Sequence, residues 1–353
     1  GLPGYLRKDG EFVLIFTGKV EGDEKKKDRQ VSIKNGYIDF PKKINKKPNR
    51  LKELNGKIKT RLDDETDLNE IRVIPNFRGG DNRTGYTIEI AYTVEEHVLD
   101  LDKDRVIGLD FGGRNTVSIA NNCRLKPIVV KGGVLKSINQ FYSKMKADIQ
   151  SVYSKQPIMC SLKDKKVICR KTGRAIQMLA WNREKMIKDI MHKYSKWIID
   201  YCLLHNIGTI VIGYDPGWKQ KVKLGKRNNQ NFVFVPFHKL VKMIQYKADE
   251  IGISVIMQDE SHTSKCSFLD GESIEHHDSY MGKRISRGLF RSAKGIIINS
   301  DTQGSYNTIK KAIPEAFKKL DVDWIEDVGL HPLRVDPLAV NKCINQIKRT
   351  VKA

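Results

Sequence analysis

Two largely apolar runs in this chain lead directly to acidic residues. Val106–Leu109 leads to Asp110, and Ile253–Met257 is followed closely by Glu260. Thr209–Gly213 is a third run of the same kind. Runs of about four to eight such residues are typical of strands buried on both faces, as in a sheet covered by helices. The pattern predicts an α/β domain with carboxylates at the ends of buried strands.

A third acid, Asp301, stands at the start of a helix predicted to extend to Phe317. Asp110, Glu260 and Asp301 are far apart in the sequence, so only a fold can bring them together. Magnesium prefers hard oxygen ligands in near-octahedral geometry. Two such ions about 4 Å apart activate the attacking water and stabilise the leaving oxygen in phosphodiester cleavage. Spacing alone leaves an alternative open, because an acid after a strand also serves as a turn former or helix cap.

The remaining pattern divides the chain into three parts. Residues 1–103 are β-rich, with apolar runs between Gly, Asn and Asp turns. Residues 104–320 form the α/β domain, with a long helical region over 134–206 that is interrupted near 156–172, and a loop-rich insertion over 261–298. Residues 321–353 carry Pro332 and Pro337 and are expected to form a poorly ordered tail.

The charge balance indicates a polyanionic partner. Lys and Arg number 64 against 42 Asp and Glu, a formal net charge of +22. Neutralisation of phosphates with counterion release supplies most non-specific nucleic-acid affinity, so nucleic acid is the expected partner. A basic but ordinary cytosolic enzyme is the alternative. No apolar stretch approaches the roughly 20 residues that span a bilayer, so no membrane partner is expected.

The six cysteines are scattered and include no C-x-x-C pair. We therefore expect free thiols and no zinc site.

Two basic segments are candidate nucleic-acid contacts. The first combines an aromatic ring with cations, which suits base stacking with phosphate contacts, although a core tryptophan is the alternative. The second lies in the loop-rich insertion and suits phosphate binding, with a solvated surface as the alternative. The candidates are Trp218, Lys219, Lys226 and Arg227 in the first segment, and Lys283, Arg284 and Arg287 in the second.

Longer strings extend this interpretation. The segment 107–116, IGLDFGGRNT, resembles the first RuvC motif of the TnpB family, the OrfB-type proteins of insertion sequences that are related to type V CRISPR effectors. The segment 259–270, DESHTSKCSFLD, resembles the second motif and its continuation. Segments 210–233, 282–290 and 299–307 are also similar to this family, and the motifs occur in family order over about residues 1–315.

This resemblance implies a RuvC-like nuclease domain of RNase H-like α/β fold, with helical and loop insertions, preceded by a β-rich, barrel-like wedge domain. It implies an RNA-guided DNA endonuclease that is associated with an insertion sequence and hydrolyses phosphodiesters with two Mg²⁺ ions. Carried over by position, Asp110, Glu260 and Asp301 are the catalytic, metal-binding acids. The implied partners are a guide RNA from the transposon end and double-stranded target DNA, in a prokaryotic cytoplasm at the nucleoid.

Some positions depart from the family pattern. A helical recognition region normally precedes the segment that begins at Gly1, so the chain is interpreted as N-terminally truncated. Many relatives carry a four-cysteine zinc ribbon between the second and third motifs, where this chain has only Cys266. His262 replaces the common Tyr, and Thr302-Gln303 replaces Val-Asn. A nuclease-inactive RNA-guided DNA-binding protein, a decayed transposon remnant and a strand-transfer transposase therefore stay open as alternatives.

Overall fold

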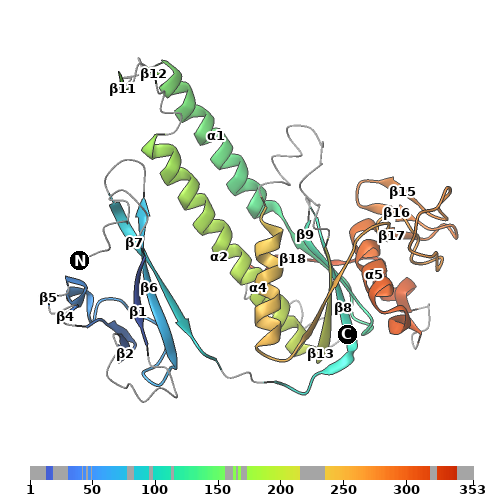
Figure 1. The fold of residues 1–353 in the computed structure, drawn as a ribbon. Helices are drawn as coiled ribbons and strands as arrows, with labels where there is room; N and C mark the ends of the chain where they lie inside the picture. The colour runs from blue at the N-terminus through green and yellow to red at the C-terminus, as the bar shows by residue number, and fades with distance from the viewer. Residues whose placement is uncertain are drawn as a thin grey trace. The chain divides into compact units, whose positions relative to one another are not determined.

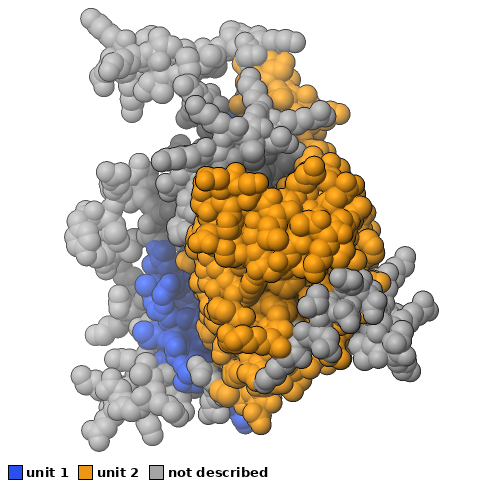
Figure 2. All heavy atoms as spheres, turned by 90° about the vertical axis from the view of Figure 1, so that its right-hand side faces the viewer, with its two compact units in different colours: residues 1–95, 156–178 blue, residues 96–155, 179–353 orange. Residues whose placement is uncertain are grey.

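The fold is known from a computed structural model in which two compact units are distinguished. The described residues are 13–18, 31–41, 43–44, 47–48, 50–77, 83–94, 98–112, 115–155, 162–163, 166–167, 173–214, 235–318 and 324–339. Unit 1 comprises residues 1–95 and 156–178, and unit 2 comprises residues 96–155 and 179–353 (Figure 2).

Unit 1 is built from short antiparallel sheets. Its largest sheet has the order β1-β6-β7, and its apolar face packs Phe16, Ile71 and Val73 against Ile38 and Phe40. Among the described residues these sheets are separate, so closure into a barrel-like wedge stays a prediction. The strands are β1 (Leu14–Thr17), β2 (Ser32–Lys34), β3 (Tyr37–Asp39), β4 (Lys43–Ile44), β5 (Lys47–Pro48), β6 (Leu68–Phe77), β7 (Arg83–Tyr92), β11 (Leu162–Lys163) and β12 (Lys166–Val167), with a 3₁₀ turn at Arg50–Leu54.

Unit 2 is organised around a six-stranded mixed sheet (Figure 1). Its strands are β8 (Asp102–Phe111), β9 (Asn115–Asn121), β10 (Ile128–Lys131), β13 (Ile207–Gly213), β14 (Ser254–Gln258) and β18 (Leu333–Val335). The strand order is β14-β13-β8-β9-β10-β18. Strand β13 pairs parallel with both β8 and β14, whereas β9 is antiparallel to β8 and β10. This mixed α/β architecture is consistent with the RuvC-like fold predicted from the sequence.

Helices cover both faces of this sheet, which explains why β13 is buried at every position and why β8 is largely apolar in its second half. The helices are α1 (Gly133–Lys155), α2 (Arg174–Leu204), α4 (Phe237–Asp249) and α5 (Ser300–Ala312), followed by short turns at Pro314–Phe317 and Ile325–Gly329. One face packs Ile107 and Leu109 of β8 against α2 and α4. The opposite face packs Val106 of β8 against Tyr306 and Ile309 of α5. Because side chains alternate along a strand, Asp110 shares the α5 face with Val106.

The interrupted helical region predicted from the sequence is confirmed as α1 and α2, two helices with the short pair β11–β12 between them. In the part of the chain that the structure describes, none of the helices is both long and apolar enough to cross a bilayer.

The insertion over 261–298 is mostly turns and loops, as predicted, and one expectation about the C-terminal segment needs correction. The insertion also holds a three-stranded antiparallel sheet that the sequence did not indicate, formed by β15 (Lys283–Ser286), β16 (Leu289–Arg291) and β17 (Ile297–Asn299). Its strands are too short for a clear period-two pattern, and the tight turn at Gly288, with φ of +92°, joins the first two. The segment expected to be a poorly ordered tail contributes β18, because Leu333 and Val335 pack on the main core beside β10.

Candidate metal-carboxylate site

Asp110 lies near the end of β8, on the face that α5 covers. It pairs with Ser118 of β9 in the antiparallel register. A Cβ on Gly304 of α5 would lie 2.8 Å from Asp110 Oδ2, and one on Gly108 would lie 2.5 Å from the Ser305 carbonyl oxygen. The helix can therefore approach the strand closely only because these positions lack side chains.

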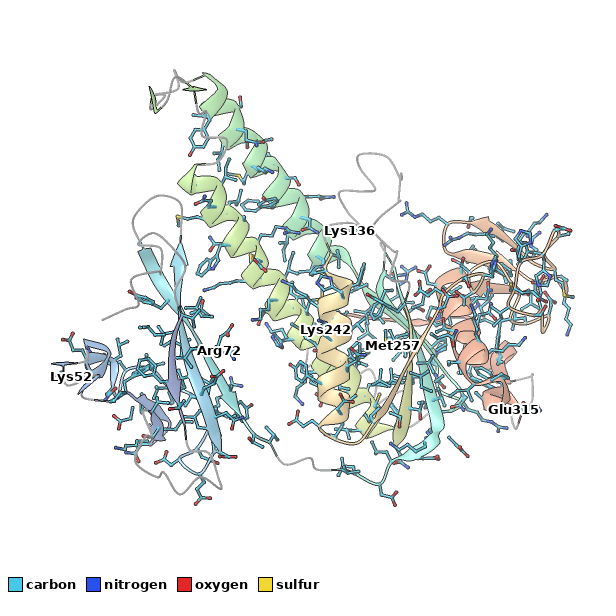
Figure 3. The ribbon with its side chains drawn as sticks, viewed as in Figure 1. Lys52, Arg72, Lys136, Lys242, Met257 and Glu315 are labelled. Atoms are coloured by element: carbon cyan, nitrogen blue, oxygen red, sulfur yellow. The ribbon has the colours of Figure 1, made fainter. Side chains whose placement is uncertain are left out.

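Glu260 follows β14 and is brought to the same edge of the sheet. Strands β8, β13 and β14 run parallel, so their carboxyl ends meet at one edge. Met257, labelled in Figure 3, lies in β14, close before this acid in the chain. A Cβ on Gly213 would lie 2.5 Å from Glu260 Oε1, so the carboxylate occupies space that the glycine leaves open.

Asp301 lies in the first turn of α5. Asn299 caps this helix by accepting hydrogen bonds from the backbone N–H groups of Asp301 and Thr302, at 3.0 and 3.1 Å. A carboxylate in the first helical turn is favoured by the helix dipole. Asn115 Nδ2 of β9 donates to Asp301 Oδ2 at 2.7 Å, which fixes one oxygen and orients the other.

The three acids act on one another electrostatically. Burial raises the pKa of Asp110 well above its usual range, and the nearby charges of Glu260 and Asp301 raise it further, while Arg284 opposes the shift. Like charges in a partly buried site disfavour ionisation, and a bound cation would reverse that effect. Within the described residues, no group of three or more His, Cys, Asp or Glu side chains could hold a metal ion as the side chains stand.

The insertion brings cations beside this site, and side chains are crowded between α5 and the β15–β17 sheet (Figure 3). Arg284 Nη2 donates to Ser300 Oγ at 2.9 Å and lies 3.7 Å from Asp301 Oδ1. Lys283 and Arg287 are exposed on the same hairpin. Of the predicted nucleic-acid contacts, Arg284 is therefore the one that the structure places against an acid of the site. Trp218, Lys219, Lys226 and Arg227 lie outside the described residues.

Two residues of this region were not identified from the sequence as part of the site. Asn115 lies inside the first motif string, but its bond to Asp301 spans 186 residues of chain. Lys311 of α5 contacts the turn that carries Glu260, binding Asp259 Oδ2 at 2.9 Å. Ser261 and Lys311 together hold the pKa of Asp259 below its usual range. No sequence signal marks a lysine at the far end of a helix as part of such a site.

His262 occupies a strained backbone position beside the acids. Its φ is +66°, in the left-handed region. Its Nδ1 lies 3.3 Å from the Tyr280 hydroxyl, and its ring stands edge-on to His276 with centroids 5.8 Å apart. These contacts give His262 a packing role in the insertion.

Two family models match the chain. The model described as OrfB_IS605, probable transposase, matches residues 89–218, and the model described as Cas12f1-like, TNB domain, matches residues 237–308. The first span includes Asp110, and the second includes Glu260 and Asp301.

Several characterised proteins are similar over part of their length. The CRISPR-associated endodeoxyribonuclease Cas12f1 of Sulfoacidibacillus thermotolerans is 25% identical over 246 residues, which cover 67% of this chain and 54% of that protein. The Cas12f1 of Syntrophomonas palmitatica is 29% identical over 264 residues, covering 72% and 50%. A TnpB-like protein of Methanocaldococcus jannaschii is 25% identical over 178 residues, covering 50% and 57%. The chain spans about half the length of these curated relatives.

A solved structure shares the fold. The cryo-EM structure of the Cas12f1-sgRNA-target DNA complex aligns with a TM-score of 0.52 at 16% identity, covering 84% of this chain and 59% of that chain.

The central mixed sheet, with helices on both faces, is consistent with a RuvC-like α/β fold. The two family models and the curated relatives support a TnpB/OrfB-family relative of the type V effectors.

Proposed function

We propose that this chain provides the nuclease centre of an RNA-guided DNA endonuclease, in which Asp110, Glu260 and Asp301 hold divalent cations. The observation that carries the proposal is the meeting of three carboxylates from β8, from the turn after β14 and from α5 at one edge of the sheet. Burial raises the pKa of Asp110, and the charges of Glu260 and Asp301 raise it further, which is the electrostatic condition that cation binding relieves.

The chemistry of the donor set suits Mg²⁺, since three carboxylates supply the hard oxygens that this ion prefers. As the side chains stand they do not form a complete metal site, so the carboxylates would have to close around the ion. The glycines at 213 and 304 let two of the carboxylates occupy space that a larger residue would fill. When bound, such ions activate a water molecule for attack on phosphorus and neutralise charge on the leaving oxygen.

The chain's own residues would orient the substrate around this centre. Asn115 fixes one oxygen of Asp301 and leaves the other directed toward Arg284. The Arg284 side chain is 55% exposed, so its guanidinium is available to a phosphate as well as to Ser300. Guanidinium groups match phosphate oxygens in pairs, so Arg284 would position the backbone of a DNA strand beside the acids.

RNA and DNA are the proposed partners. The net charge of +22 favours a polyanion, and the solved relative is a complex with sgRNA and target DNA. In such systems base pairing reads the sequence, while the protein binds the backbone. We propose that the guide RNA is encoded beside the gene, at the end of an insertion sequence.

The test combines this chain, RNA transcribed from the DNA flanking its gene, and a plasmid library of targets, with and without Mg²⁺. RNA- and Mg²⁺-dependent cuts that Asp110→Ala removes would support the proposal. DNA that is bound with RNA but stays intact would instead identify a binding-only protein. Cleavage that Asp110→Ala leaves unchanged would exclude this site as the catalytic centre.

A further inference from the structure

The turn that carries Glu260 is held by a single lysine from a distant helix. Lys311 Nζ contacts Asp259 Oδ2 at 2.9 Å, the Ser261 carbonyl oxygen at 3.0 Å and Ser261 Oγ at 2.9 Å. An ammonium group has three donors, and Lys311 directs all of them to this turn. The Lys311 side chain is 21% exposed and its partner Asp259 is 58% exposed, so the ammonium group is partly covered while the turn that it holds lies at the surface.

Glu260 lies between the two residues that Lys311 holds. On its N-terminal side, Asp259 Oδ2 accepts hydrogen bonds from both the backbone N–H and the hydroxyl of Ser261. On its C-terminal side, the Thr263 hydroxyl donates to the Glu260 carbonyl oxygen at 2.8 Å. The backbone of Glu260 is therefore fixed from both directions, and its carboxylate is aimed over Gly213.

The helix that supplies Lys311 also positions the other two acids. Asp301 lies in its first turn, and Gly304 faces the Asp110 carboxylate. The helix is continuous from Ser300 to Ala312. Helix α5 thus sets the position of Asp301, restricts the space open to the Asp110 carboxylate and holds the turn that carries Glu260.

We propose that Lys311 is a positioning residue that fixes the direction of the Glu260 carboxylate and thereby the affinity of the acidic site for its cation. This inference rests on the proposed function, because it assumes that the three acids bind divalent cations. Residues that orient metal ligands through hydrogen bonds change metal affinity or activity by about 10- to 100-fold when they are replaced. A lysine that only stabilised the turn would change the melting temperature without changing cation affinity.

The test measures the melting temperature of the whole chain as Mg²⁺ is added, so it needs neither RNA nor cleavage. A cation that binds only the folded state raises the melting temperature, and fitting the rise in stability to RT ln(1 + [Mg²⁺]/Kd) gives the dissociation constant. The variants are Lys311→Met, which removes the three donors at similar length, and Lys311→Arg, which restores donors. Lys318→Met is the matched control, since Lys318 is an exposed lysine paired with Glu315 just beyond the same helix.

We expect Lys311→Met to raise the fitted Kd for Mg²⁺ by about 10- to 100-fold. Lys311→Arg should recover most of the loss, and Lys318→Met should match the wild type. In cleavage assays with saturating RNA and DNA, Lys311→Met should lower kcat while leaving DNA affinity unchanged. An unchanged Kd for Mg²⁺ in Lys311→Met, with a normal response in the wild type, overturns this inference alone. A wild-type chain that neither responds to Mg²⁺ nor cleaves DNA overturns the proposed function and this inference with it.

Discussion

Asp110 is placed where its own ionisation is disfavoured. Burial raises its pKa, and the charges of Glu260 and Asp301 raise it further. A buried carboxylate that costs stability is often a sign of function, because the ligand that neutralises it provides the compensation. A bound cation would neutralise the charge on Asp110, so this residue links the electrostatics of the site to its proposed chemistry.

Replacing Asp110 with Asn should stabilise the cation-free protein. The change removes a charge that burial and two neighbouring carboxylates disfavour, so the melting temperature in EDTA should rise by about 2–4 °C, the shift expected for about 1 kcal/mol in a domain of this size. The same change should remove the rise in melting temperature caused by Mg²⁺. Asp189→Asn is the control, because Asp189 is an exposed partner of Lys193.

The difference in melting temperature between the wild type and Asp110→Asn should depend on pH. Because the pKa of Asp110 is higher in the folded state than the ordinary value of 3.8, ionisation favours unfolding as the pH rises above that value. The advantage of Asp110→Asn should therefore be greatest near neutral pH and should shrink as the pH falls toward 3.8. A variant that melts below the wild type in EDTA at neutral pH would contradict this account of the site.

At the same scale, the sequence predicts some residues of the site better than others. Asp110 and Glu260 each follow an apolar run that predicts a strand, and the resemblance of the surrounding strings marked them as candidate site acids. The strand before Glu260, predicted to be buried, has only intermediate and exposed residues. Lys311 could not be identified, because its partner Asp259 is 52 residues away in the chain, and only the packing of α5 on the sheet joins them. Pairings of this kind are determined by the tertiary fold and leave no local pattern.

At the scale of the elements, α5 can approach β8 only through glycines. A Cβ at position 304 would meet Asp110 Oδ2, the end of a side chain, whereas a Cβ at position 108 would meet the backbone oxygen of Ser305. The Asp110 side chain can rotate away, but the backbone oxygen of Ser305 can move only if the helix shifts. The two glycines should therefore have different consequences when they are replaced.

We predict that Gly304→Ala removes DNA cleavage with little loss of stability. Alanine is favoured over glycine inside a helix by about 1 kcal/mol, which offsets the displacement of the Asp110 carboxylate. Gly108→Ala should instead destabilise the fold by about 1–3 kcal/mol through overpacking. Urea unfolding and cleavage rates, measured together on both variants, check this. Equal stability losses in the two would show that the helix, and not the carboxylate, yields at position 304.

The insertion is also held to α5 by buried polar contacts. Asn307 Nδ2 donates to the carbonyl oxygens of Thr263 and Cys266 at 2.8 and 2.7 Å. The Glu272 carboxylate, 6% exposed as a residue, accepts from the backbone N–H groups of Ser267 at 2.5 Å and Met281 at 2.9 Å. These bonds, in place of a regular apolar pattern, explain why the sequence indicated only loops here.

Replacing Glu272 with Ala should loosen this insertion locally. Two backbone donors would lose a charged acceptor, at about 1.5–3 kcal/mol for each hydrogen bond. Hydrogen exchange should therefore accelerate over residues 261–299 and stay unchanged in β8 and β13. Glu275→Ala is the control, since the Glu275 carboxylate accepts only from the exposed Ser273 hydroxyl among the hydrogen bonds described. Uniform acceleration over the whole of unit 2 would show that the insertion does not unfold on its own.

At the scale of the whole molecule, the excess of positive charge should determine how the affinity of the chain for nucleic acid depends on salt. When binding is driven by phosphate contacts, the logarithm of the binding constant falls linearly with the logarithm of the salt concentration. The slope has a magnitude of about 0.7–0.9 for each phosphate neutralised. We predict a steep salt dependence of RNA binding by filter assay. Removing the charges of Lys283 and Arg287 together should lower the slope by about one to two. Affinity that is independent of salt would contradict a role for the net charge of +22.

Structural elements with a long local sequence pattern could be predicted from the sequence, and elements that depend on distant partners could not. The α/β class, the two long helices and strands β8, β13 and β14 of the central sheet follow from apolar runs and helical spacing in the sequence. Strand β18 depends on a partner far away in the chain, so composition alone suggested a tail. The strands of the insertion are short and pair with one another, so they left no clear pattern. Closure of unit 1 into a barrel-like wedge stays a prediction.

The central claim is that the acids of β8, β14 and α5 form one cation-dependent nuclease centre. The most direct measurement is the rate of plasmid cleavage by this chain with its flanking RNA, as Mg²⁺ is varied, for the wild type and for Asp301→Asn. The account predicts RNA-dependent cutting that rises with Mg²⁺ in the wild type and is lost in Asp301→Asn, while RNA binding is equal in both. Cutting by Asp301→Asn at the wild-type rate, or cutting by the wild type in EDTA, would contradict it.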